Sequence, residues 1–140
     1  MTAPGGSSPH RIVLDTSAYS RMRAGSAEVL DRVAAAQTVH LPVIVLGELE
    51  AAFRIGKRTQ ENHVALNEFL AEPFVSVLPV TPDVARRYGA IFAELRKAGT
   101  PVPVNDIWIA ATTLDVGAHL LTFDGDFDRI AGLDHTVLTA

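Results

Sequence analysis

Short apolar runs alternate along the chain with longer segments in which apolar residues recur at helical spacing. The short runs predict strands at residues 12–14, 39–45, 75–80, 119–123 and 137–138. The longer segments predict helices at residues 26–37, 46–55, 59–72, 82–98 and 106–116. Parallel strands need a crossover connection, usually helical, so this alternation predicts a single α/β domain with a parallel sheet of about five strands flanked by helices.

Residues with strong capping preferences mark several helix ends. Ser26 is a good N-cap for the first predicted helix, and Asn105 for the last. Thr81 and Pro82 supply an N-cap and a first-turn proline for the helix that ends before Gly99. Glycine tolerates the left-handed conformation that is common after helix C-termini, so Gly99 marks the end of this helix as Thr81 and Pro82 mark its start.

The chain is long enough for one domain with a sizeable core, since 48% of its 140 residues are hydrophobic. Residues 1–9 (MTAPGGSSP) lack apolar periodicity and are interpreted as a flexible leader, with the domain spanning residues 10–140. A formal net charge of −4 disfavours a protein that coats nucleic acid through bulk positive charge. No membrane helix or signal peptide is evident, so we expect no membrane association and a cytoplasmic location.

Four acidic residues stand close to the ends of apolar runs. Asp15 and Asp124 directly follow predicted strands, while Glu48 and Asp106 lie in the first turns of predicted helices. The carboxyl ends of parallel strands share one edge of a sheet, so we expect these side chains to meet there. Each alone has an ordinary explanation as a cap or turn residue. Together, however, carboxylates raise one another's pKa and destabilise a fold unless a cation or a chemical role compensates.

The composition narrows the choice of cation. With no cysteine and only five scattered histidines, the available ligands are carboxylate oxygens, which suit Mg²⁺ or Mn²⁺ rather than zinc. A divalent ion held by carboxylates activates water and neutralises charge in a phosphoryl transition state. The four acids therefore indicate hydrolysis of phosphodiesters.

Four motifs carry a resemblance to a known family. They are I-V-L-D-T-S at residues 12–17, V-I-V-L-G-E-L at 43–49, V-N-D-I-W-I-A-A-T at 104–112 and L-L-T-F-D-G-D-F at 120–127. In this order and spacing they resemble the PIN-domain ribonucleases, and more narrowly the VapC toxins of bacterial VapBC toxin-antitoxin pairs. The resemblance extends from about residue 11 to the C-terminus.

The resemblance implies an endoribonuclease that depends on Mg²⁺ or Mn²⁺ and inhibits translation and growth by cleaving cellular RNA. The metal-binding, catalytic acids of the family match Asp15, Glu48, Asp106 and Asp124. Asp126 matches a further acidic position that supports the metal in some members, so the division of roles between Asp124 and Asp126 stays open. The hydroxyl positions that hydrogen-bond to the acids match Thr122 and Thr16 or Ser17.

The resemblance also implies two protein partners. One is a second copy of the chain, because the family forms homodimers. The other is a VapB-type antitoxin, whose C-terminal segment lies across the acidic site and commonly inserts a basic side chain.

Other residues and a second function class leave alternatives open. The basic side chains at Arg54, Lys57, Arg58, Arg86 and Arg87 form either solvated helix faces or contacts to the RNA backbone. A PIN-like domain that binds RNA or protein without cleavage is the competing function. An incomplete set of acids would favour it, whereas here the set is complete. Trp108 is expected to pack against the sheet.

Overall fold

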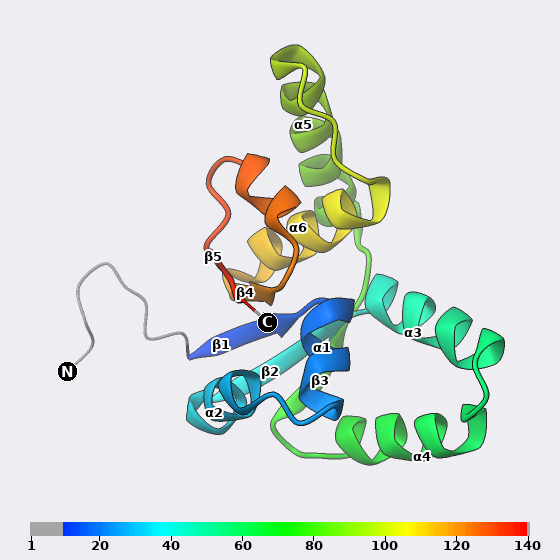
Figure 1. Ribbon diagram of the computed structural model, residues 1–140. Helices are drawn as coiled ribbons and strands as arrows, with labels where there is room; N and C mark the ends of the chain where they lie inside the picture. The colour runs from blue at the N-terminus through cyan, green and yellow to red at the C-terminus, as the bar shows by residue number, and fades with distance from the viewer. Residues whose placement is uncertain (1–9, 140) are drawn as a thin grey trace.

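The computed structural model describes residues 10–139, and both the predicted leader and Ala140 lie outside the described residues. Five parallel strands form one sheet in the order β3-β2-β1-β4-β5 (Figure 1). The strands are β1 (Arg11–Leu14), β2 (Thr38–Pro42), β3 (Val75–Leu78), β4 (His119–Thr122) and β5 (His135–Val137). The predicted α/β architecture with a five-stranded parallel sheet is confirmed.

Within residues 10–139, six α-helices and one 3₁₀ helix connect and flank the strands. They are α1 (Thr16–Arg23), α2 (Ala27–Ala35), α3 (Val43–Ile55), α4 (Thr59–Leu70), α5 (Pro82–Ala98), α6 (Val104–Val116) and η1 (Gly125–Arg129). In Figure 1, α5 and α6 lie on one side of the sheet and α2 and α4 on the other. None of the helices within residues 10–139 has the length and apolar character needed to span a bilayer.

The core is centred on β1, the middle strand of the sheet, and on its neighbour β4. Residues 12–14 and the Leu120–Leu121 pair are fully buried, because helices cover both faces of these strands. Register pairs Leu14 with Leu121, so the two strands end side by side. The residues that follow them therefore emerge at neighbouring points on the carboxyl edge of the sheet.

The capping predictions hold for two helices. Ser26 and Thr81 are the N-caps of α2 and α5, and each side-chain oxygen accepts a hydrogen bond from a backbone N–H in the first turn. Gly99 follows α5 with φ of 71°, in the left-handed region. Capping chemistry in the sequence therefore located these ends correctly.

The boundary between β2 and α3 was predicted wrongly. The strand ends at Pro42 and the helix begins at Val43, although the apolar run continues to Val45. Pro42 has no N–H to donate to a ladder and occupies the N-cap position with φ of −59°. Periodicity alone cannot separate a buried strand from a buried helix over so short a run.

Three other sequence expectations need correction. The last helix begins at Val104, with Pro103 rather than Asn105 at its N-cap. The last strand covers His135–Val137 instead of residues 137–138. Helix α1 was not predicted, because Thr16–Arg23 has too few apolar residues to give a clear helical period.

Trp108 packs against the neighbouring helix α5. Its ring stacks on Tyr88 of α5, with ring centroids 4.0 Å apart and an interplanar angle of 21°. Tyr88 in turn stacks on Phe92 at 6.0 Å. This stack joins α6 to α5, a contact that the sequence did not predict.

Candidate active site

The predicted acids lie at the carboxyl edge of the sheet, where β1 and β4 are neighbours. The chain leaves β1 toward β2 on one side of this pair, whereas β4 leads to β5 on the other. Such a reversal of strand order is the place where open parallel sheets bind ligands. Asp15 follows β1 directly, and Asp124 follows β4 after Phe123.

Asp15 is held in one orientation by hydrogen bonds to both of its carboxylate oxygens. As the N-cap of α1, it accepts a bond from the N–H of Ala18 at 2.8 Å and one from Ser17 Oγ at 2.7 Å, both on Oδ1. Thr122 Oγ1 donates to the other oxygen, Oδ2. Burial raises the pKa of Asp15 and the bonds from Thr122, Ala18 and Ser17 oppose that rise, so the bonds favour the ionised form.

The same two hydroxyl groups connect Asp15 to the loop after β4. Thr122 Oγ1 also accepts the N–H of Asp124 at 2.9 Å, and Ser17 Oγ accepts the N–H of Phe123 at 3.0 Å. Each hydroxyl therefore donates a hydrogen bond to Asp15 and accepts one from a backbone N–H of the segment that carries Asp124. The predicted hydroxyls contact the acids, and they fix the position of β1's end relative to the acidic loop.

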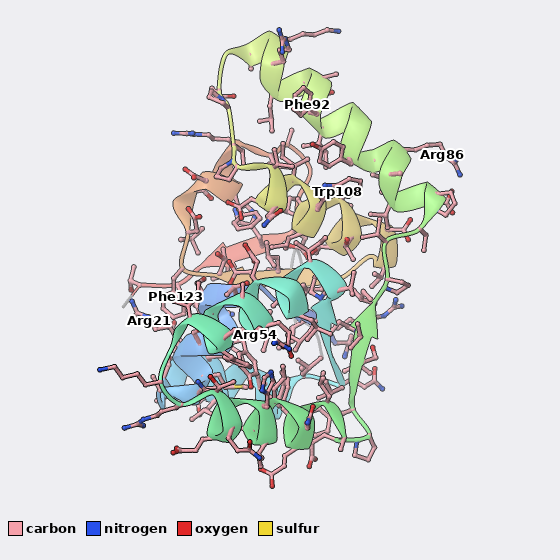
Figure 2. All side chains as sticks on the ribbon, turned by 90° about the vertical axis from the view of Figure 1, so that its right-hand side faces the viewer. Arg21, Arg54, Arg86, Phe92, Trp108 and Phe123 are labelled. Atoms are coloured by element: carbon pink, nitrogen blue, oxygen red, sulfur yellow. The ribbon has the colours of Figure 1, made fainter. Side chains whose placement is uncertain are left out.

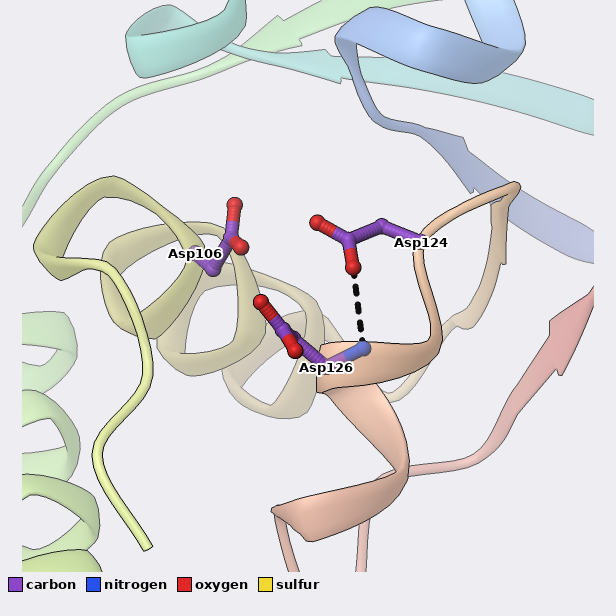
Figure 3. Close-up of side chains that lie close together, drawn as sticks. All are labelled: Asp106, Asp124 and Asp126. Atoms are coloured by element: carbon purple, nitrogen blue, oxygen red, sulfur yellow. Dashed lines mark hydrogen bonds between the residues drawn. The ribbon is translucent and has the colours of Figure 1, made fainter.

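Asp106, Asp124 and Asp126 form a compact group of carboxylates (Figure 3). One oxygen from each residue lies within 4.8 Å of the others. Asp106 comes from the first turn of α6, while Asp124 caps η1 by accepting the N–H of Asp126 at 2.9 Å. The chain thus brings two acids of the 124–126 loop against an acid from a separate helix.

The negative charges of the four other acids all act on Asp106. Burial and the negative charges of Asp124, Asp15, Glu48 and Asp126, in that order, raise the pKa of Asp106 to about 7. Within residues 10–139 the sole ion pair to any of these acids is between Arg129 and Asp126, at 3.7 Å. A group of carboxylates with so little positive charge nearby fits a divalent cation bound through oxygen.

Glu48 lies in the second turn of α3, because that helix begins at Val43 and not at residue 46 as expected, and its side chain is also held by hydrogen bonds. Thr16 Oγ1 donates to its Oε1, and the side-chain amide of Asn105 donates to Oε2 at 3.2 Å. Asn105, expected as a helix cap, therefore orients an acid of the site instead. The sequence signal for this role is its place directly before Asp106, but spacing alone does not reveal the partner.

None of the basic residues predicted as RNA contacts forms an ion pair with the site acids within residues 10–139. Three of them form ion pairs with surface carboxylates: Arg54 with Glu50 at 3.6 Å, Arg87 with Asp115 at 3.2 Å, and Arg86 with Asp83. Figure 2 places Arg86 at the opposite side of the molecule from Phe123. Lys57 and Arg58 lie in the turn between α3 and α4. Their role as RNA contacts stays a prediction.

A basic residue that the sequence reasoning missed lies beside the acidic loop. The guanidinium of Arg21, in the last turn of α1, lies over the ring of Phe123 at 4.9 Å from its centroid (Figure 2). The residue was not singled out because α1 itself was not predicted. The pairing joins residues about a hundred positions apart, which no local pattern reveals.

Comparisons with known proteins agree with this geometry. The family model of the PIN domain matches residues 12–133. Ribonuclease VapC5 of Mycobacterium tuberculosis (strain ATCC 25618 / H37Rv) is 30% identical over 126 residues, which cover 89% of this chain and 90% of that protein.

Two solved structures give the same result. VapBC-5 from Mycobacterium tuberculosis, a member of the VapBC family of toxin-antitoxin systems, contains a chain with a TM-score of 0.72 and 28% identity, covering 94% of this chain and 100% of that chain. VapBC2 from Rickettsia felis, bound to a DNA fragment from its promoter, gives a TM-score of 0.78 and 25% identity, covering 90% and 97%. With a family match across most of its length and a relative of this extent, the chain belongs to the PIN-domain family, among the VapC toxin ribonucleases of VapBC systems.

Proposed function

We propose that this chain is an endoribonuclease that depends on Mg²⁺ or Mn²⁺ and serves as the toxin of a VapBC-type pair. The observation that carries the proposal is the group of carboxylates formed by Asp106, Asp124 and Asp126 at one edge of the sheet, where the charges of Asp15 and Glu48 also act on Asp106. In a family whose relatives are named ribonucleases, such a site fits phosphodiester hydrolysis. Cleavage of cellular RNA would inhibit translation and growth.

Asp106, Asp124 and Asp126 offer three carboxylate oxygens close enough to hold one ion, and Asp15 and Glu48 add negative charge that acts on Asp106. A divalent ion bound there would supply an activated water and positive charge for the phosphoryl transition state. Carboxylate oxygens select hard cations over zinc. Asp124 and Asp126 both belong to this group, so we assign neither of them as the sole ligand of the loop.

The remaining polar residues of the site keep these acids in place. Ser17 and Thr122 fix both oxygens of Asp15, and a carboxylate has further lone pairs with which to ligate. Thr16 and Asn105 hold Glu48 in the same way. Since the ligands are oriented before an ion or RNA binds, little ordering remains to be done when the substrate arrives.

The reaction is tested with purified chain, RNA and either Mg²⁺, Mn²⁺ or EDTA. Attack by water with departure of the 3′-oxygen breaks the P–O3′ bond and leaves a 5′-phosphate and a 3′-hydroxyl, which end-specific labelling identifies. We expect cleavage with Mg²⁺ or Mn²⁺ and none with EDTA. RNA binding without cleavage in either metal would instead favour the non-catalytic binding module.

We also propose an antitoxin partner and a homodimer for this chain. Solved structures of similar proteins are VapBC complexes, some of them bound to promoter DNA. The five carboxylates form an anionic surface that a basic segment of an antitoxin complements, because an arginine can donate two charge-assisted hydrogen bonds to a carboxylate. Such a segment would prevent both the metal and the phosphate from binding.

Co-expression tests the partner proposal. The product of an adjacent short reading frame with a DNA-binding fold and a basic tail should restore growth that this chain alone inhibits. Replacing the basic residues of that tail should abolish the inhibition of ribonuclease activity in the purified pair. Full inhibition after loss of every basic residue in the tail would contradict capture of the acidic site.

A further inference from the structure

Arg21 is an exposed residue that contacts an aromatic ring beside the acidic site. Its guanidinium lies 4.9 Å from the centroid of Phe123, the residue directly before Asp124 (Figure 2). The N–H of Phe123 donates to Ser17 Oγ, and that hydroxyl donates to Asp15. The ring that carries the cation is therefore tied to the same hydrogen-bonded segment that orients two of the acids.

The guanidinium of Arg21 is free to bind an anion. Within residues 10–139 no carboxylate oxygen lies within the 4.0 Å ion-pair limit of Arg21, in contrast to Arg54, Arg86 and Arg87. Stacking on a ring occupies one face of a guanidinium and leaves the N–H groups at its edge available. Because the ring restrains the side chain, binding an anion would cost Arg21 less side-chain entropy than it would cost an unrestrained surface cation.

The site itself creates the need for such a cation. Five carboxylates repel the phosphates of an RNA chain, and Arg129 is the one cation of the described chain that pairs with any of them. An ion bound among the acids would act on the scissile phosphate. A phosphate further along the strand needs a separate positive charge beside the acids, and, within the described chain, Arg21 lies next to Phe123 without forming an ion pair with them.

We propose that Arg21, positioned by Phe123, binds an RNA backbone phosphate that neighbours the scissile one. This inference rests on the proposed ribonuclease function. It attributes affinity for the RNA substrate to one positioned cation, and not to a positive charge of the whole chain. Arg21 is a binding residue and Phe123 is a positioning residue. Neither takes part in the bond-breaking step.

An ordinary structural role for Arg21 makes different predictions. A cation in the last turn of α1 interacts favourably with the helix dipole, and its contact with Phe123 adds some stability. If that were its whole role, replacing it would lower the melting temperature without changing RNA affinity. The two roles are therefore separated by measuring RNA binding and thermal stability on the same variants.

The experiment uses the full chain and a randomised single-stranded RNA pool as probe. Fluorescence anisotropy in the Asp106→Asn background gives affinity as a function of salt, and Mn²⁺-dependent cleavage gives KM and kcat in the otherwise unaltered chain. Arg21→Gln is compared with Lys97→Gln, which removes the same charge from the exposed C-terminal end of α5. Arg21→Lys keeps the charge but loses the planar group, and Phe123→Leu keeps an apolar side chain but loses the ring.

We expect Arg21→Gln to raise KM about tenfold at low salt with little change in kcat, because a charge-assisted contact to substrate is lost. The slope of log affinity against log salt should fall by about 0.7, the value for one phosphate contact on a single strand. Arg21→Lys and Phe123→Leu should raise KM by smaller factors. Lys97→Gln should match the parent.

Two results would overturn the inference, and they have different consequences for the proposed ribonuclease function. If the parent cleaves RNA while Arg21→Gln has the same KM and salt slope as Lys97→Gln, Arg21 does not bind RNA and the ribonuclease proposal survives. If the parent neither cleaves nor binds the RNA pool with Mg²⁺ or Mn²⁺, the ribonuclease proposal and the role of Arg21 both fail.

Discussion

At the scale of single residues, Asp106 experiences the combined charge of four other acids. Burial and these charges raise its pKa to about 7, against an ordinary value of 3.8. Between these two values the folded protein keeps a proton that the unfolded chain releases. The free energy of unfolding of the metal-free protein therefore falls as pH rises from about 4 to about 7, and the full destabilisation persists above that range.

Asp106→Asn should remove this loss of stability at higher pH. The amide keeps the shape of the side chain without its charge, so the metal-free variant should be more stable than the parent at pH 8, by about 1–3 kcal/mol after allowance for solvent screening. At pH 4 the two proteins should be equally stable. Urea unfolding at both pH values, in EDTA, measures the difference. A difference that does not change with pH would contradict the assigned origin of the pKa shift.

Thr122 links two acids through one buried hydroxyl, which donates to Asp15 and accepts from the N–H of Asp124. Thr122→Val should destabilise the protein by about 1–3 kcal/mol, because it leaves buried polar groups unpaired. It should also weaken Mn²⁺ binding by about 10–100-fold, since a group that orients a proposed ligand is lost. Unfolding and Mn²⁺ titration calorimetry measure the two effects.

Thr113→Val is the matched control. Thr113 is equally buried, but its hydroxyl donates to the carbonyl of Ile109 within α6, away from the acids. The control should lose little stability and bind Mn²⁺ as the parent does. Equal effects of the two substitutions on Mn²⁺ affinity would show that Thr122 has no specific role at the site.

At the scale of secondary structure, α5 packs against α6 through a stack of aromatic rings. Tyr88 lies between Trp108 and the more exposed Phe92. Tyr88→Leu should lower the free energy of unfolding by about 1 kcal/mol, because stacking contributes beyond the buried area. Phe92→Leu, at the exposed end of the stack, should cost less.

The single tryptophan makes this measurement specific. Urea transitions followed by Trp108 fluorescence and by far-UV circular dichroism should coincide in the parent, because α5 is part of one cooperative unit. If the fluorescence change came first, α5 would unfold on its own. In that case Tyr88→Leu should shift the fluorescence transition alone.

The elements differ in how far the sequence predicts them. Helix α5 was predicted at both ends because a capping threonine, a first-turn proline and a following glycine act locally. The start of α3 was not predicted correctly, because Pro42 interrupts an apolar run that fits a strand equally well. Helix α1 escaped detection because its place depends on Asp15 as N-cap and on packing against distant elements, which periodicity does not record.

In the candidate site, too, some features can be predicted from the sequence and others cannot. The placement of acids near the ends of apolar runs predicted that they approach one another, because a parallel sheet aligns its carboxyl ends. Asp106 and Asp124 do lie together, and the charges of Asp15 and Glu48 act on Asp106, although Glu48 lies in the second turn of α3 and not in the first as expected. The hydrogen bonds of Asn105 to Glu48 and of Thr122 to Asp15 join residues 57 and 107 positions apart. The Arg21 and Phe123 pair is also non-local, so these partners appear only in the folded chain.

At the scale of the whole molecule, the sheet concentrates negative charge at one edge, while Arg54, Arg86 and Arg87 pair with carboxylates elsewhere. The chain carries a net charge of −4, and five acids of the site account for more than this excess. A divalent ion would reduce the charge at the place where the phosphate must approach. Metal binding and RNA binding should therefore depend on each other, and both depend on the acids.

Cleavage of RNA as a function of Mn²⁺ concentration, compared between the parent and two aspartate variants, tests the central claim most directly. The account predicts that cleavage by the parent rises to saturation with Mn²⁺, and that Asp106→Asn abolishes it. Asp115→Asn, a change of the same kind in the same helix but at the Arg87 ion pair, should behave as the parent. Cleavage by Asp106→Asn within about tenfold of the parent, about 1.4 kcal/mol in activation free energy, would contradict a metal site built on these carboxylates.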